Sequence, residues 1–217
     1  MIQIIQDKID HFFSKYPKVT FSENEIIFRP GTPLTDIFHL QSGTVRMYSI
    51  SADGEEVTLH IFRPTSMFPL MLLMTKKNNT YYFESSESSV AIKAPANSVV
   101  DFLKSEPDIL YDVTCRFSEA ISGLLTRIEN QSVENSYHKI ILLLLYLTDK
   151  FGEEFETGQK ISIPITHEDI ASWIGIRRET VSRQIEKLQK NGLVKVQKKH
   201  YVLPDVKKLK LFVTNQG

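Results

Sequence analysis

The sequence predicts an α+β chain of three parts: a small β-barrel or jelly roll, one long helix, and a winged helix-turn-helix. Three observations predict this. Short β-type runs broken by turn residues fill residues 19–94. Apolar residues then recur at helical spacing. Near the C-terminus, two short amphipathic helices joined at a glycine precede a hairpin. We place the domain limits at residues 1–106, 107–135 and 136–217.

The composition is that of an ordinary globular protein, with 41% hydrophobic and 24% charged residues in a chain of 217. The longest apolar run, residues 140–147, is too short to span a bilayer. The N-terminus lacks a secretory cleavage site, so we expect a cytoplasmic protein with no membrane partner. Cys115 is the only cysteine, which excludes disulfide frameworks, and we expect it to fill space in a core.

The net charge of zero hides an asymmetry along the chain. From Lys160 onward there are twelve Lys or Arg and five Asp or Glu, a balance of +7. Residues 1–159 therefore carry −7. A basic C-terminal part beside an acidic remainder is typical of a nucleic-acid-binding module attached to another domain.

The first part begins with a predicted helix over residues 2–16, which Pro17 ends. The strands that follow are separated by turns at Gly31, Gly43 and Gly54, where a tight turn needs a positive φ. The dipeptide Asp53-Gly54 between two alternating runs predicts a hairpin. Residues 95–106 are expected to form a short helix.

The long helix carries an apolar stripe with spacings of 3, 4, 4, 3 and 4. This is the spacing of a coiled-coil seam, and it predicts a homodimer. The alternative is an amphipathic helix packed on its own barrel. The predicted seam residues are Leu110, Val113, Phe117, Ile121, Leu124 and Ile128.

A second helix, residues 136–151, is ended by Gly152, and residues 153–160 are expected to be a polar loop. Thr166 is then a good helix N-cap, with Asp169 three positions later. Gly175 permits a sharp turn into a helix from about Arg178 to residue 190. A hairpin, residues 193–196 and 201–203, completes a winged helix-turn-helix.

The outer face of this last helix suits a DNA major groove, because Arg pairs with guanine and Glu accepts from cytosine. The alternative is a plain helical hairpin with solvated charges. The candidate base-reading residues are Arg178, Glu179, Ser182 and Arg183. The candidate DNA-backbone residues are Thr166, His167, Arg177, Thr180, Lys187, Lys198 and Lys199.

The run Arg178-Glu179-Thr180-Val181-Ser182-Arg183, with Ile170-Ala171 and Gly175 before it, resembles the recognition helix of the Crp/Fnr family of transcription regulators. The resemblance extends along nearly the whole chain. It implies a double-stranded β-helix like that of cyclic-nucleotide-binding domains, a dimerisation helix, and a homodimer on a palindromic TGTGA- or TTGAT-like site. It assigns base reading to Arg178, Glu179 and Arg183, with Ser182 contacting bases in some members, and it implies RNA polymerase as a partner. Arg177 departs from the family's usual Ser or Thr cap.

The sensor part departs further from the family. Pro69-Leu70 stands where cyclic-AMP-binding members have Gly-Glu, and Asn78-Asn79-Thr80 stands where they have the phosphate-binding arginine. Lys76 and Lys77 nearby are expected to be solvated. We therefore expect no control by cyclic AMP. The cysteines of iron–sulfur members are absent from this sequence, and His39 and His60 are expected to be strand residues rather than haem ligands. The effector is unknown; the Met-rich stretch 67–74 either lines an apolar pocket or belongs to the core.

Two other classes of function are disfavoured. The six histidines are scattered, and neither a catalytic triad nor a zinc-protease pattern occurs at useful spacing, so we expect no enzyme, no catalytic residue and no metal site. A cyclic-nucleotide-type domain that regulates other proteins without binding DNA would leave the winged helix unexplained.

Overall fold

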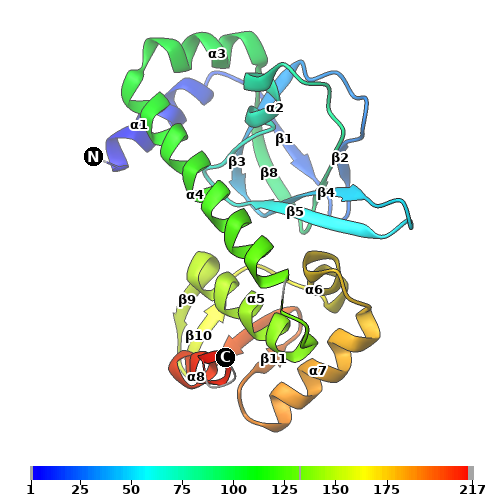
Figure 1. Cartoon of the computed structure of the whole chain (residues 1–217). Coiled ribbons are helices and arrows are strands. Elements are labelled where there is room, and N and C mark those ends of the chain that lie inside the picture. The colour runs from blue at the N-terminus through cyan, green and yellow to red at the C-terminus, as the bar shows by residue number, and fades with distance from the viewer. Residues whose placement is uncertain (1, 132, 215–217) are drawn as a thin grey trace. The chain divides into compact units, whose positions relative to one another are not determined.

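The computed structural model describes residues 2–131 and 133–214 (Figure 1). The chain divides into two compact units, residues 1–122 and 123–217. The division falls inside helix α4 (Pro107–Gln131), the helix that the sequence analysis set apart as a domain of its own. Met1, Ser132 and residues 215–217, which belong to the predicted domain ranges, lie outside the described residues.

The first unit contains two four-stranded antiparallel sheets, with strand orders β1-β8-β3-β6 and β2-β7-β4-β5. This is the predicted roll, and the fold class is confirmed. Helix α1 precedes the strands, α2 interrupts them, and α3 and the start of α4 follow. The bounds are α1 (Ile2–Phe13), β1 (Lys18–Phe21), β2 (Ile26–Phe28), β3 (Asp36–Ser42), β4 (Val45–Ile50), β5 (Glu56–Phe62), β6 (Met67–Phe68), α2 (Leu70–Thr75), β7 (Tyr82–Ser85), β8 (Ser89–Pro95) and α3 (Ala96–Ser105).

The predicted turn chemistry is present. Gly54 has φ +82°, and its N–H donates to the Ser51 carbonyl at 3.0 Å, which closes the turn between β4 and β5. Gly43 has φ +80°, and a Cβ there would overlap Ser89. A side chain at residue 43 is therefore excluded by both the backbone conformation and the neighbouring strand.

Phenylalanine rings fill the space between the two sheets. Phe38 and Phe68 come from one sheet and Phe28 and Phe83 from the other, and all four are buried. The Phe38 and Phe68 ring centroids lie 5.5 Å apart, and those of Phe28 and Phe83 lie 5.6 Å apart. Phe62 bridges Phe68 and Phe83 at 5.4 and 5.9 Å. The interior of the roll is thus packed by the protein's own side chains.

The Met-rich stretch contributes partly to this packing. Phe68 and Leu72 are buried in the aromatic cluster, and Leu70 in a second cluster beside it. Met71 and Met74 are exposed on α2. Of the two alternatives, core packing therefore holds for Phe68, Leu70 and Leu72, whereas Met71 lies outside the core and lines a surface pocket.

The second cluster joins α1, α3 and the start of α4 to the roll, and Figure 1 shows these three helices together on one side of the strands. Val113 of α4 is 3% exposed within this cluster, and Leu110 and Phe117 pack against it. Val113, which was predicted to lie in the dimer seam, is therefore covered by its own unit in the single chain. Cys115, expected in a core, is exposed.

The second unit is a helical module with one antiparallel sheet of order β11-β12-β10-β9. Residues 153–160 were expected to be a loop; they instead form most of a hairpin, and β10 pairs with β12 of the wing. A terminal helix, α8, was not predicted. The bounds are α5 (Ser136–Phe151), β9 (Gly152–Phe155), β10 (Gly158–Ile161), α6 (His167–Ile174), α7 (Arg178–Lys190), β11 (Lys195–Gln197), β12 (His200–Leu203) and α8 (Val206–Thr214).

Candidate DNA-binding site

Helix α6 begins at a reciprocal cap. The Thr166 hydroxyl accepts a hydrogen bond from the Asp169 N–H at 3.1 Å, and the Asp169 carboxylate accepts from the Thr166 N–H at 2.7 Å. The predicted N-cap is confirmed. Because both groups of Thr166 are engaged in the cap, its first role is to fix where α6 starts.

The turn between α6 and α7 depends on Gly175. This residue has φ +67°, and its N–H donates to the Ala171 carbonyl at 2.9 Å. Arg177 then caps α7 without a side-chain hydrogen bond, as its departure from Ser or Thr implies. The left-handed residue at 175 reverses the chain within three residues, so α7 starts at Arg178 directly after α6.

One face of α7 is buried and the other is free. Val181, Ile185 and Leu188 are almost fully buried, which confirms the predicted inner stripe. The opposite face presents Arg178 and Glu179 in the first turn and Arg183 one turn later, all of them exposed. A basic and acidic face at the start of a helix is the arrangement that reads base edges in a major groove.

The two arginine side chains are only loosely held. Arg178 Nε lies 4.0 Å from the Glu168 carboxylate, and both side chains are mostly exposed. Arg183 donates to the Thr180 hydroxyl at a long 3.5 Å. Ion pairs this exposed contribute little to stability, so little free energy opposes turning either guanidinium toward a ligand.

Ser182 is placed differently from the other predicted base readers. It is half-buried, and its Oγ lies 2.9 Å from Nδ1 of His167, the first residue of α6. Burial lowers the pKa of His167 from its ordinary value, and Arg178 lowers it further while Glu186 raises it. Both residues were predicted from the sequence to contact DNA, but their contact with each other was not predicted.

The predicted DNA-backbone residues are spread around α7. The Lys187 ammonium lies over the Tyr137 ring, 4.8 Å from its centroid. Lys198 has φ +58° in the turn of the wing, and the Lys199 carbonyl accepts from the Ile165 N–H at 2.7 Å. The wing is therefore tied by its backbone to the segment that leads into α6, and its lysine side chains follow one another at the tip.

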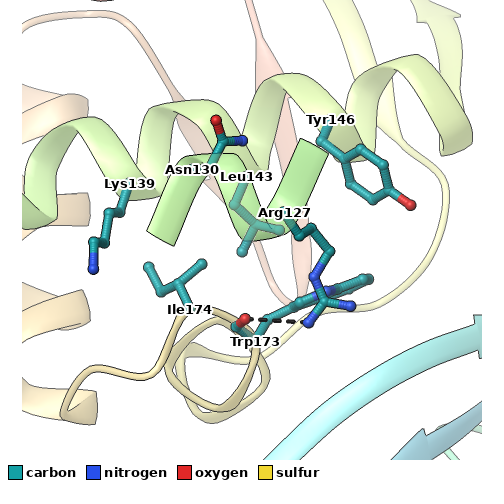
Figure 2. A pocket seen from close by; sticks show the side chains of 7 residues that line it. All are labelled: Arg127, Asn130, Lys139, Leu143, Tyr146, Trp173 and Ile174. Atoms are coloured by element: carbon teal, nitrogen blue, oxygen red, sulfur yellow. Dashed lines mark hydrogen bonds between the residues drawn. The ribbon is translucent and has the colours of Figure 1, made fainter. Parts of the chain in front are cut away.

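A small pocket at the other end of α6 was not foreseen (Figure 2). The Arg127 guanidinium of α4 donates to the Trp173 carbonyl at 3.3 Å and lies 5.2 Å from the centroid of its ring. Tyr146 of α5 meets the same ring edge to face. Burial lowers the pKa of Arg127 to about 10. The sequence shows no motif here, because the three residues are brought together only by the packing of α4, α5 and α6. The lining residues are Arg127, Asn130, Lys139, Leu143, Tyr146, Trp173 and Ile174.

In the predicted effector region, three of the residues at the expected place are engaged in the fold itself. Pro69 caps α2 and Leu70 is buried. The Asn79 side chain is also buried, and it donates to the carbonyls of Arg29 and Tyr81 at 2.7 and 2.9 Å. His39 and His60 lie in β3 and β5, as expected of strand residues.

The described residues contain neither a candidate metal site nor a candidate membrane span. In that part of the chain, no three His, Cys, Asp or Glu side chains gather closely enough to hold a metal ion. None of its helices is long and apolar enough to cross a membrane.

Known proteins resemble the chain in both units. Residues 18–106 match the family model described as the cyclic nucleotide-binding domain, and residues 138–212 match the Crp-like helix-turn-helix domain. The global nitrogen regulator of Nostoc sp. is 29% identical over 182 residues, which cover 83% of this chain and 82% of that protein.

Two solved structures share the fold. A CooA mutant from Carboxydothermus hydrogenoformans superposes with a TM-score of 0.77 at 20% identity, covering 94% of this chain and 90% of that one. A CRP/FNR-family transcriptional regulator from Thermus thermophilus has a TM-score of 0.71 at 24% identity, covering 93% of this chain and all of the other.

Proposed function

Because the chain belongs to the Crp/Fnr family of transcription regulators, we propose that it binds a palindromic DNA site as a homodimer, with α7 of each copy in a major groove. The observation that carries this proposal is the exposed Arg178, Glu179 and Arg183 on the free face of α7. Two such helices read half-sites one helical turn apart. The resemblance to the Crp/Fnr family implies that these half-sites form a TGTGA- or TTGAT-like palindrome.

Base reading is assigned to the start of α7. Arg178 and Arg183 each suit the O6 and N7 acceptors of guanine, and Glu179 suits the N4 amino group of cytosine. Ser182 lies on the same half of the helix. Each good bidentate contact contributes roughly 1–3 kcal/mol of discrimination between bases.

We assign the contacts with DNA phosphates, which position the protein on the duplex, to residues around the exposed face of α7. The positive charge for these contacts is carried by Lys198 and Lys199 at the wing tip and by Lys187 on α7. Arg177, Thr180, His167 and Thr166 lie at the ends of α6 and α7, where phosphates flank a groove-bound helix. These contacts would fix the register without carrying sequence information.

A binding assay with matched variants tests both assignments. Fluorescence anisotropy on a palindromic duplex and on a scrambled one gives the specificity ratio. Arg183→Ala is expected to lower that ratio by roughly 5- to 150-fold, since it removes one bidentate contact. Lys198→Ala is expected to weaken binding to both duplexes equally and to reduce the salt slope by about one. Lys104→Ala on α3 is the control lysine in the first unit. If Arg183→Ala kept the full sequence preference, the assignment of base reading to α7 would be wrong.

The homodimer is proposed on the second half of α4. Ile121, Leu125 and Ile128 are 58%, 56% and 63% exposed and are spaced by 4 and 3. Continued toward the N-terminus, the same spacing selects Ser118, Thr114 and Tyr111, which are also exposed. A coiled-coil seam along these residues differs from the seam that the sequence spacing favoured. Its residues are exposed in the single chain.

We also propose that cyclic AMP does not control this regulator. The phenylalanines between the sheets and the engaged Asn79 side chain support this, since the rings offer no hydrogen-bond donor and the Asn79 amide already donates to two carbonyls. Titration calorimetry with cyclic AMP is the test, and micromolar binding would overturn it. The resemblance to the Crp/Fnr family implies RNA polymerase as a partner, and we propose the cytoplasm as the location.

A further inference from the structure

The contact between His167 and Ser182 links the start of α6 to the middle of the proposed reading face. Ser182 stands four residues after Arg178 and three after Glu179, so these three residues share one side of α7. The His167 Nδ1 to Ser182 Oγ distance of 2.9 Å is that of a hydrogen bond. Both side chains are half-buried, so the contact is partly shielded from water.

The hydrogen bond has two possible directions, and they leave Ser182 with different chemistry. A hydroxyl has one proton to donate and two lone pairs to accept with. If Nδ1 is unprotonated, Ser182 donates its proton to the ring and can only accept from a third group. If Nδ1 carries a proton, Ser182 accepts from the ring, and its own O–H is free to donate.

We propose that His167 is a specificity-determining residue that acts through Ser182, by fixing whether this serine accepts from or donates to a base. The inference rests on the proposed function, because it requires α7 to lie in the major groove. With His167 neutral and its proton on Nε2, Nδ1 accepts the Ser182 proton, and Ser182 accepts from the amino group of adenine or cytosine. With His167 protonated on both nitrogens, Ser182 donates to guanine or to the O4 of thymine.

The charges around His167 decide when it protonates. Arg178 and Glu186 of α7 act on it with opposite signs, and Glu168 follows it on α6. The burial of the ring and the Arg178 charge lower the pKa of His167 from its ordinary value of about 6.5. The neutral ring therefore predominates at pH 7 to 8, and the switch to the donor form of Ser182 occurs below pH 6.5.

Selection from a duplex library with a randomised half-site tests the proposal. Comparison of wild type with Ser182→Ala at pH 8 first identifies the position that Ser182 reads. Wild type is expected to prefer A or C over G or T there by roughly threefold to tenfold, the range for one neutral hydrogen bond. His167→Leu frees the hydroxyl for both roles, so the preference is expected to fall below about twofold. His11→Gln, on an exposed histidine of α1, is the matched control and keeps the wild-type preference.

The pH dependence gives a readout that a merely structural role of His167 would not move. From pH 8 to pH 5.5, the wild-type preference at this one position is expected to shift from A or C toward G or T. Ser182→Ala and His167→Leu are expected to show no such shift, and thermal unfolding checks that both variants fold. His167→Asn, which keeps a side-chain hydrogen-bonding group, replaces the leucine variant if that one is unstable.

The outcomes separate this inference from the function on which it rests. Sequence-specific binding with an unchanged base preference in the His167 variant, or with no pH shift in wild type, overturns the role of His167 alone. Wild-type protein that binds all duplexes equally overturns the proposed function, and this inference falls with it.

Discussion

Leu125 on α4 gives the sharpest test of the dimer, because it separates the seam proposed from the exposed residues of α4 from the seam that the sequence spacing favoured. The predicted stripe included Val113 and Leu124 but not Leu125. In the structure Val113 is covered by its own unit, and Leu125 is the more exposed of the two neighbouring leucines. We therefore expect Leu125→Ala to weaken the homodimer.

The magnitude follows from the exposure of this side chain. Complete burial of a leucine contributes about 2 kcal/mol relative to an exposed one. Leu125 is 56% exposed in the single chain, so a partner helix can add only about 1 kcal/mol at this site. A homodimer contains the residue twice, which brings the loss to about 2 kcal/mol. This corresponds to a dissociation constant raised about 30-fold.

Sedimentation equilibrium over a range of protein concentrations measures this change directly. Leu211→Ala on α8 is a matched control, because Leu211 is the same residue type at 58% exposure and lies off the stripe. Its dimer affinity is expected to equal that of wild type. Equal weakening by the two substitutions, or a change below threefold for Leu125→Ala, would refute the assignment of the seam.

Three further predictions concern stability. Burial lowers the pKa of His39 to about 4 in the folded protein. As the pH falls, the histidine of the unfolded chain is therefore protonated before that of the folded chain. The free energy of unfolding is then expected to fall by up to roughly 3 kcal/mol between pH 6.5 and pH 4. Urea unfolding of His39→Gln should show a smaller loss over this pH range than wild type. Phe83→Ala empties the centre of the roll and is expected to lower the unfolding free energy by about 3–5 kcal/mol, whereas the partly exposed Phe212→Ala should cost far less; equal losses would contradict the packed interior. Thr166→Ala removes the α6 cap and is expected to cost about 1 kcal/mol in thermal unfolding, with Thr166→Ser restoring most of it.

The helix-turn-helix could be predicted closely from the sequence because its signals are local. A capping threonine with an acid three residues later, and a glycine where the chain must turn, act within one helical turn of themselves. The inner stripe of α7 likewise follows from a period of 3.6 residues. For these features the order of residues along the chain already implies the geometry, and the structure agrees at Thr166, Gly175 and Val181.

The features that were missed depend on partners far away in the sequence. Residues 153–160 are polar, and the hairpin of β9 and β10 is joined to the wing by the pairing of β10 with β12. Arg127, Tyr146 and Trp173 meet because three helices cross at one place. His167 and Ser182 were both named from their positions, but their contact requires the crossing of α6 and α7. No spacing rule connects residues on different helices.

The sequence by itself therefore determined the α+β class, the turns, and the helix that carries Arg178, Glu179 and Arg183. The tertiary structure decided which apolar residues are already buried by contacts within their own unit. On α4, a stripe of the right spacing continues for about five turns, but its first half packs on α1 and α3 and only its second half stays exposed. Between the sheets, residues that could have lined a pocket pack against each other instead. Periodicity gives the direction of a side chain from its own backbone, whereas the neighbour that covers it is set by the packing of the whole unit.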